Sequence, residues 1–320
     1  MHPDLILPFL GALLGLPALG ALAWLLLRRW ARLAPALRWS AFAAIGLAEL
    51  AYWLGVYAFF IEPNRLDIRR ETIISETWRG RPLAIAAVGD IHIGSPHMNL
   101  ARVRRLVARV NALEPDLILL LGDYVGDNSP GAPLRDEATV LEGIEALGAL
   151  RAPLGVFAAI GNHDNWWDGA RVRAALKSAG VTPLVNAARL LRPEHPFVIV
   201  GLDDHDTGKP DYAGATAQLS APAQGVSRIV FMHAPDAFPD VPSGPALTVA
   251  AHTHCGQVSV PFLGRPVVPS AYGQRYACGL VAEGGRQLFV TGGVATSVLP
   301  VRFLNPPEIA LLTIAAPAAD

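Results

Sequence analysis

The sequence of 320 residues contains little cysteine and no excess of basic charge. Its two cysteines, Cys255 and Cys278, are too few for the disulfide framework of a small secreted domain. We interpret them as free thiols, although they could also form one bridge. The 26 basic and 27 acidic residues give a net charge of -1, whereas binding to a phosphate backbone usually requires a basic excess. The composition therefore gives no reason to expect a nucleic acid as a partner.

Charged residues are also scarce, at 17% against 52% apolar residues, and they are rarest near the N-terminus. Residues 5–27 contain no charged side chain, and residues 39–61 contain only Glu49. Each run can cross a hydrocarbon core of about 30 Å as a helix. We predict a membrane anchor at residues 1–65 with two transmembrane helices. A cleaved signal peptide is disfavoured, because no basic residue precedes the first run and a second run follows at once.

Arginines between and after the two runs favour one orientation in the membrane. Residues 28–38 hold four arginines, residues 62–70 hold three, and the N-terminal tail holds no lysine or arginine. Because positive charge in short loops prefers the cytoplasmic side, we expect the loop between the helices to be cytoplasmic. Both termini, and with them the whole C-terminal part, would then lie on the extracytoplasmic face.

From about residue 82 the pattern changes to short apolar runs that alternate with amphipathic helices. Runs typical of buried strands lie at 83–88, 117–121, 154–160, 197–202, 228–232, 247–251, 287–291 and 309–314. Helical patterns lie at 100–113, 135–150 and 169–179. Alternating strands and helices predict an α/β domain, which we place at residues 82–316. We interpret residues 66–81 as a linker to the anchor.

Polar side chains follow five of the predicted strands at the point where each strand ends. They are Asp90, His92, Asp123, Asn162, His163, Asp164, His233, His252 and His254. In open α/β sheets, ligands bind at the carboxyl edge of the strands. A single histidine in such a place is more often a hydrogen-bonded core residue than a ligand. These five short segments, however, hold five of the nine histidines, which indicates one shared site.

The nitrogen and oxygen ligands of this set suit borderline or hard divalent ions such as Mn, Fe, Zn, Ni or Co. The candidates are too numerous for one ion with open positions, whereas two ions that share one carboxylate would use them well. Two such ions about 3.5–4 Å apart can clamp a phosphate oxygen and generate a hydroxide for in-line attack. The pattern therefore favours hydrolysis of a phosphoester.

Five motifs resemble, in order and spacing, those of the calcineurin-like metallophosphoesterase family. They read GDIH (residues 89–92), GD (122–123), GNHD (161–164), MHAPD (232–236) and AHTH (251–254). The ending FVTGGVATSVLPVRFLNPPEIALLTI is similar to a bacterial membrane-associated branch, which includes exported phosphodiesterases and enzymes like UDP-2,3-diacylglucosamine hydrolases. The resemblance covers residues 83–314 and implies two packed mixed β-sheets flanked by helices. This four-layer sandwich would follow the N-terminal transmembrane hairpin.

The resemblance also implies a role for each polar residue. The first metal ion would be bound by Asp90, His92 and His254. The second would be bound by Asn162, His233 and His252, and Asp123 would bridge the two ions. His163 would face the substrate and protonate the leaving oxygen, while Asp164 would orient the His163 ring.

Two positions depart from the family pattern without removing a ligand. Ala251 replaces the glycine that usually precedes the first histidine of the last motif, and Cys255 replaces the glycine that usually follows the second. The methyl group of Ala251 would narrow the approach of the backbone to the substrate. Cys255 is interpreted as an extra soft ligand, a redox-sensitive thiol or a small filler of space. We take it, together with His97 and His205, as a candidate substrate contact.

We therefore expect an integral protein of a bacterial inner membrane that hydrolyses a phosphodiester or pyrophosphate. Hydroxide held by two divalent metal ions would attack in line, without a covalent phosphoenzyme. The expected partners are the lipid bilayer and a phosphorylated lipid or small phosphoester. Two alternatives stay open: a non-catalytic metal-binding scaffold of the same fold, and a phosphomonoesterase that acts on proteins. The sequence gives no information on protein partners.

Overall fold

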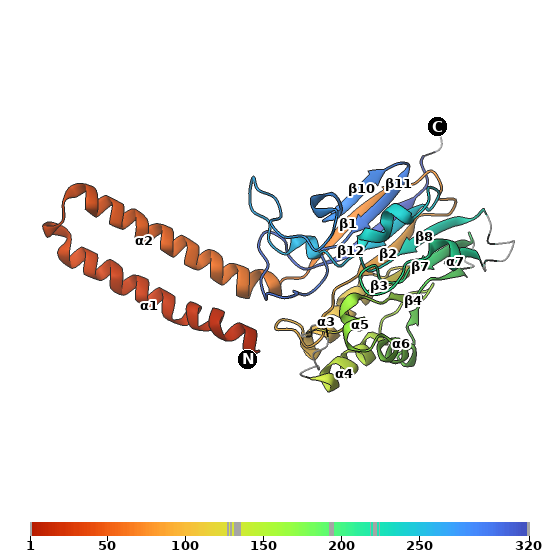
Figure 1. Cartoon of the computed structure of the whole chain (residues 1–320), viewed down its shortest axis with the longest axis horizontal. Helices are drawn as coiled ribbons and strands as arrows, with labels where there is room; N and C mark the ends of the chain where they lie inside the picture. The colour runs from red at the N-terminus through yellow and green to blue at the C-terminus, as the bar shows by residue number, and fades with distance from the viewer. Residues whose placement is uncertain are drawn as a thin grey trace.

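A helical hairpin is attached to one end of an α/β domain in the computed structural model of the chain (Figure 1). The structure describes residues 2–126, 128, 130, 136–191, 195–217, 219, 223 and 225–318. The hairpin consists of α1 (Ile6–Arg29) and α2 (Pro35–Val56). Helix α2 continues through a π-helical turn (Tyr57–Ile61) and a 3-10 turn (Glu62–Asn64).

Both hairpin helices are long and apolar enough to cross a membrane, and both contain the runs predicted from the sequence. Their most apolar windows are 0% buried in the first helix and 11% buried in the second. The helices mainly contact each other, for example where the Tyr52 hydroxyl donates to the Ala12 carbonyl at 2.6 Å. A helix of a soluble core would instead bury an apolar stripe. The hairpin therefore presents apolar side chains to its surroundings.

Two six-stranded sheets form the domain. The first sheet has the order β1-β12-β2-β3-β4-β5, with β1 (Asp67–Ile74), β12 (Glu308–Ala315), β2 (Leu83–Val88), β3 (Leu117–Leu121), β4 (Val156–Ala159) and β5 (Thr182–Pro183). The second has the order β10-β11-β9-β8-β7-β6, with β10 (Gly279–Glu283), β11 (Arg286–Val290), β9 (Leu247–Ala250), β8 (Ser227–Phe231), β7 (Phe197–Gly201) and β6 (Ala187–Leu191). Both sheets mix parallel and antiparallel pairs, as predicted.

Three apolar layers hold the domain together. Ile85 and Leu119 of the first sheet face Phe231 and Val249 of the second in the central layer. A second layer joins the first sheet to α3 (Leu100–Asn111), α4 (Glu137–Leu147) and α6 (Gly169–Ser178). The third covers the outer face of the second sheet, where α7 (Tyr212–Ala217) lies. Strands buried on both faces explain the continuous apolar runs in the sequence, and the layers confirm the predicted sandwich.

The eight predicted strands are confirmed within two residues at each end, whereas several short elements were not predicted. The predicted linker at residues 66–81 is wrong in its first half, because β1 pairs in parallel with β12 along its whole length. This edge strand carries alternating polar residues, so a search for continuous apolar runs misses it. The short β5, β6, β10, α7 and α5 (Asn162–Trp167) were also missed. Residue 135, at the start of the predicted helix 135–150, lies outside the described residues.

The segment after α2 is fastened to the domain by buried polar contacts. Arg102 of α3 is buried although it is charged. Its guanidinium donates to the Pro63 carbonyl at 2.6 Å and to Asn64 Oδ1 at 2.9 Å. The fully buried Glu62 carboxylate accepts from the backbone N–H groups of Leu304, at 2.8 Å, and Asn305. The hairpin and the domain are therefore joined by buried hydrogen bonds as well as by the chain.

Candidate active site

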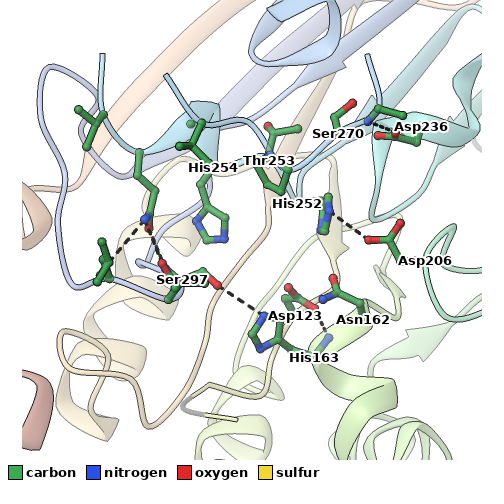
Figure 2. Close-up of a pocket in the computed structure, with 18 of the residues that line it drawn as sticks. Asp123, Asn162, His163, Asp206, Asp236, His252, Thr253, His254, Ser270 and Ser297 are labelled. Atoms are coloured by element: carbon green, nitrogen blue, oxygen red, sulfur yellow. Dashed lines mark hydrogen bonds and ion pairs between the residues drawn. The ribbon is translucent and has the colours of Figure 1, made fainter. Parts of the chain in front are cut away.

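All seven predicted metal ligands converge at one edge of the domain. They come from the loops that follow β2, β3 and β4 of the first sheet and β8 and β9 of the second. In Figure 2 the side chains of Asp123, Asn162, His252 and His254 surround one space, with His163 beside them. The carboxyl ends of strands from both sheets thus build a single site.

One group of ligand atoms comes from Asp90, His92 and His254. The Nε2 atoms of His92 and His254 lie 3.2 Å apart, and Asp90 Oδ1 lies 3.8 Å from His254 Nε2. Two imidazole nitrogens and one carboxylate oxygen at these separations can bind one divalent cation between them. This is the set that the family resemblance implied for the first ion.

The second group comes from Asn162, His233 and His252. His233 Nε2 lies 3.0 Å from both Asn162 Oδ1 and His252 Nδ1. Asp123 lies between the two groups, because its Oδ2 atom is 3.3 Å from His233 Nε2 and 3.6 Å from His92 Nε2. Its carboxylate therefore lies between the two ligand groups, the position that the resemblance expects of a bridging residue.

The buried state of these groups fits a cation. Asp90 Oδ2 is buried without a hydrogen-bond partner, and Gly293 leaves beside it the space that a Cβ atom would fill. Burial raises the pKa of Asp90 to about 7 and lowers the pKa of His92 and His252 to about 3. Neutral imidazoles offer the lone pairs that a metal requires, and a cation would stabilise the unpaired carboxylate. The donor set therefore fits two divalent metal ions.

Three of the four ligand histidines have an acceptor at the ring nitrogen that faces away from the cluster. The acceptors are the Val125 carbonyl for His92 (3.3 Å), the Leu121 carbonyl for His233 (2.7 Å) and the Asp206 carboxylate for His252 (3.3 Å). An acceptor at that position keeps the proton outside and turns the lone pair of the other nitrogen inward. Asp206 was not among the predicted site residues.

The fourth ligand histidine, His254, is supported by the fully buried Arg302. The Arg302 guanidinium donates to the carbonyl oxygens of Gly292 (2.7 Å), Ala295 (3.1 Å), Asn305 (3.2 Å) and His254 itself (3.2 Å). These bonds hold the loop after β11 against the loop that carries the ligand. Arg302 was not predicted, because a single arginine in a loop carries no sequence signal.

The backbone at most of the ligands has an unusual conformation. Five of the seven have a positive φ: Asp90 (55°), His92 (44°), Asp123 (56°), His252 (68°) and His254 (50°). Residues other than glycine adopt this left-handed region rarely, at a cost of about 1–3 kcal/mol each when it is sparsely populated. Such strain concentrates at functional sites, where the surrounding structure enforces it. At these five ligands the left-handed conformation turns the side chain back towards the cluster soon after the strand ends.

His163 is held in one orientation by Asn128. The Asn128 amide donates from Nδ2 to the His163 carbonyl at 2.8 Å, which leaves its Oδ1 atom 2.7 Å from His163 Nδ1. Oδ1 can only accept, so the His163 proton lies on Nδ1 in the neutral ring and Nε2 carries the lone pair. The ring packs 4.4 Å from Trp166, and Nε2 lies 3.5 Å from Ser297 Oγ. Asn128 was not predicted, because no motif marks it.

The role predicted for Asp164 is wrong. Its carboxylate does not contact the His163 ring but accepts from four backbone N–H groups. They belong to Tyr124 (2.8 Å), Gly161 (2.9 Å), Asp123 (3.0 Å) and Val125 (3.1 Å). A carboxylate one residue beyond His163 on the same helical turn points away from that ring and towards the neighbouring loop. Asp164 therefore shapes the loop that carries the bridging residue.

A cavity of about 710 Å³ opens from the ligand cluster. Apolar residues form much of its wall: Trp166, Val258, Pro266, Val267, Pro269, Val298, Leu299 and Val301. Several of them are also exposed at the surface, so the apolar wall extends to the mouth. Among the described residues that line the cavity there is no lysine or arginine. The cavity thus joins a metal-binding end to a largely apolar outer part, whose lining also holds the carboxylates of Asp206 and Asp236.

The three predicted substrate contacts, His97, His205 and Cys255, do not lie together in the cavity. His205 lines the cavity. His97 is buried outside the lining, where its Nε2 atom lies 3.3 Å from the Pro300 carbonyl.

Ala251 is fully buried between the sheets against Gly89, so its methyl group does not narrow the site.

Cys255 and Cys278 form a disulfide, with their Cα atoms 4.8 Å apart. The interpretation of two free thiols is therefore wrong, because the loop between the two cysteines brings their sulfur atoms together. Cys255 is also buried and absent from the described cavity lining, so it is neither a free metal ligand nor a substrate contact there. Two cysteines 23 residues apart give no sequence signal of pairing.

Two neighbouring ligand groups that each suit a divalent cation lie at the strand ends of this sandwich, with a fixed histidine beside them. This arrangement is that of a metal-dependent phosphoester hydrolase. A family model described as calcineurin-like phosphoesterase matches residues 83–256, which include all seven ligands. The chain belongs to this family, and the resemblance drawn from the motifs is confirmed.

Relatives are similar over most of the chain. The uncharacterized metallophosphoesterase YkuE of Bacillus subtilis (strain 168) is 31% identical over 266 residues, covering 81% of this chain and 88% of that protein. The phosphodiesterase YaeI of Escherichia coli (strain K12) is 30% identical over 262 residues, covering 80% and 91%. A transmembrane protein with metallophosphoesterase domain from Danio rerio is 28% identical, covering 71% of this chain and 52% of that protein.

Proposed function

We propose that the protein is a membrane-anchored phosphodiesterase whose substrate is a lipid phosphodiester. The cavity supports this, because it joins a site for two cations to apolar walls without a lysine or arginine in the described lining. A phosphodiester carries a single negative charge, which the two ions neutralise. Phosphomonoesters and pyrophosphates carry more charge and are commonly held by additional arginine or lysine side chains. The relative named a phosphodiesterase also favours this substrate class.

In the proposed mechanism each side chain has one task. When bound, the two metal ions would supply Lewis acidity and a hydroxide at neutral pH. Asp123 would keep the two ligand groups at a fixed separation, because its carboxylate lies beside one histidine of each group. His163, with Nδ1 fixed by Asn128, would direct Nε2 into the cavity and give a proton to the leaving oxygen. Burial lowers the pKa of His163, which makes its protonated ring a stronger acid.

The hairpin is proposed to span the bacterial inner membrane, with the domain on the extracytoplasmic face. Its uncovered apolar surface supports the span, and relatives from Danio rerio and Bos taurus are named transmembrane proteins. The disulfide supports the extracytoplasmic face, since disulfides persist in oxidising compartments and are rare in the cytosol. The arginines between the helices favour the same orientation.

A protease-protection experiment tests this orientation. Protease added outside intact spheroplasts should digest the domain and leave the hairpin protected, because the two spans place the domain outside. Measurement is by immunoblot with tags at residue 318 and in the loop between the helices. Digestion of the domain only after the membrane has been broken would place it in the cytoplasm and overturn the proposal.

The substrate class is tested with the full-length, manganese-loaded protein in mixed micelles. We expect kcat/KM for long-chain phospholipid diesters to exceed that for a soluble short-chain phosphodiester with the same alkyl leaving group by about tenfold or more, because each buried methylene contributes about 0.8 kcal/mol. The panel also holds a nucleotide-sugar lipid with a pyrophosphate, which should react more slowly. Equal rates on lipid and soluble diesters would count against a lipid substrate.

A further inference from the structure

Large apolar side chains project from two loops at the mouth of the cavity. We call them the apolar rim: Phe262, Leu263, Val267, Val298, Leu299 and Leu304, all of them exposed. Val267, Val298 and Leu299 also line the cavity, so the rim continues its apolar wall. Contiguous exposed apolar surface on a soluble face is unfavourable and marks a contact with another molecule or a membrane.

The fold presents this rim through strained backbone. Phe262, Val298 and Leu304 all have positive φ, at 68°, 63° and 53°. For a β-branched residue such as Val298 this conformation is an outlier, and it persists only where surrounding contacts enforce it. A loop that faces water would normally fold so that large apolar side chains such as these are buried. The strained loops instead hold them outward.

The two rim loops are joined to each other. Val258 and Phe303 form a parallel β-bridge, and the Ser259 N–H donates to the Phe303 carbonyl at 2.8 Å. Gln257 adds a bond from Nε2 to the Ser297 carbonyl at 2.9 Å. The rim is therefore one supported surface rather than two independent loops.

This surface is continuous with the end of α2. The Arg302 N–H donates to the Ala58 carbonyl at 3.0 Å, and the ring of Tyr57 lies edge-on to that of Phe303 at 6.3 Å. Figure 1 shows the blue loops of the domain beside the orange end of the hairpin. If the hairpin spans the membrane, the rim lies at the level where α2 leaves the hydrocarbon.

We infer that the apolar rim inserts into the leaflet from which α2 emerges, so that the cavity opens directly onto the lipid surface. The inference rests on the proposed membrane anchor. Apolar side chains gain free energy on leaving water, and interfacial surfaces settle about 5–10 Å into the boundary between headgroups and acyl chains. A lipid phosphodiester could then reach the ligand cluster while its acyl chains follow Val298 and Leu299 back to the leaflet.

The test uses fluorescent labels on the full chain in vesicles of phosphatidylethanolamine and phosphatidylglycerol. Both natural cysteines are bonded, so Phe262→Cys introduces one reactive thiol for an environment-sensitive dye. Ile74→Cys is the matched control, since Ile74 is also exposed and lies roughly 23 Å along β1 from Asp67. Leu14→Cys, in the middle of α1, reports whether the hairpin is in the membrane.

Nitroxides placed high on the acyl chains should quench the dye at positions 262 and 14 and leave the dye at position 74 unquenched. The inference would be overturned if the dye at position 262 has the emission spectrum that it shows in water and is not quenched. An unquenched dye at position 14 would overturn it too, because the anchor itself would then be absent from the bilayer. If the dye at position 262 is shielded in detergent without lipid and the protein elutes as a dimer, the rim contacts a second copy instead.

Activity distinguishes this inference from the proposed substrate. Phe262→Asp should lower turnover of lipid diester in vesicles by about tenfold, the effect of losing one buried aromatic contact, while Ile74→Asp should not. Both variants should hydrolyse soluble bis-p-nitrophenyl phosphate like the wild type. Quenching at position 262 without turnover of any lipid would leave the rim in place and reject the lipid substrate. Lipid turnover that Phe262→Asp does not change would reject the rim.

Discussion

Asp123→Asn is expected to abolish turnover and to release metal from both sites of the purified protein. The substitution keeps the shape of the side chain but removes the negative charge that lies between the two ligand groups. Burial opposes ionisation of Asp123, but the neighbouring His233 and His163 outweigh it and hold its pKa well below the usual range. The loss should exceed the roughly 10²–10⁴-fold effect of removing a general acid, because both ions depend on this carboxylate.

Metal content by mass spectrometry and hydrolysis of bis-p-nitrophenyl phosphate measure this result. Asp240→Asn is the matched control, since Asp240 is an exposed aspartate that does not line the cavity. The control should keep both metal and activity. An Asp123→Asn protein that retains two ions per chain would contradict the bridging role.

His163→Ala is expected to lose activity without losing metal. The predicted loss is about 10²–10⁴-fold for a diester with an alkyl leaving group, which needs a proton to depart. The loss should be much smaller for bis-p-nitrophenyl phosphate, because nitrophenolate leaves without one. Steady-state kinetics on both substrates and metal analysis provide the measurement. Release of metal, or an equal loss on both substrates, would show that His163 does not act as a proton donor.

Substitutions of Asn128, whose Oδ1 atom lies 2.7 Å from His163 Nδ1, test the same role of His163. Asn128→Ala frees the His163 ring and should lower kcat on the alkyl diester by about 10–100-fold, as the loss of an orienting partner commonly does. Asn128→Asp keeps the acceptor and adds a negative charge, so it should preserve much of the activity. The charge favours the protonated ring, so the pKa of His163 rises and the alkaline limb of the pH profile moves to higher pH. An unchanged profile would limit Asn128 to a structural role.

The parts of the fold that could be predicted are those with a strong periodic signal. Strands such as β3 are buried on both faces and therefore appear as uninterrupted apolar runs. The ligands could be found because each directly follows such a strand, so the ends of the strands locate the site. Edge strand β1 lacks this signal, since its stability comes from pairing with β12 rather than from apolar burial on both faces.

The unpredicted parts depend on contacts between segments far apart in the chain. Asn128 reaches His163 across 35 residues, and Arg302 reaches the His254 loop across 48. A single sequence contains no signal for such pairs. Asp164 shows a different difficulty, since its motif was identified correctly while its direction depends on a short helix, α5, that was not predicted. The disulfide likewise depends on the path of the loop between its cysteines.

The contact between Glu62 and the loop after β11 decides how the protein can be shortened for study. A truncated chain that starts at Asp67 would leave the Leu304 and Asn305 amides without their acceptor, at about 1–3 kcal/mol for each buried group. It would also deprive Arg102 of Pro63. A shortened chain is therefore better started at Glu62, a boundary that removes the two apolar helices and keeps the carboxylate.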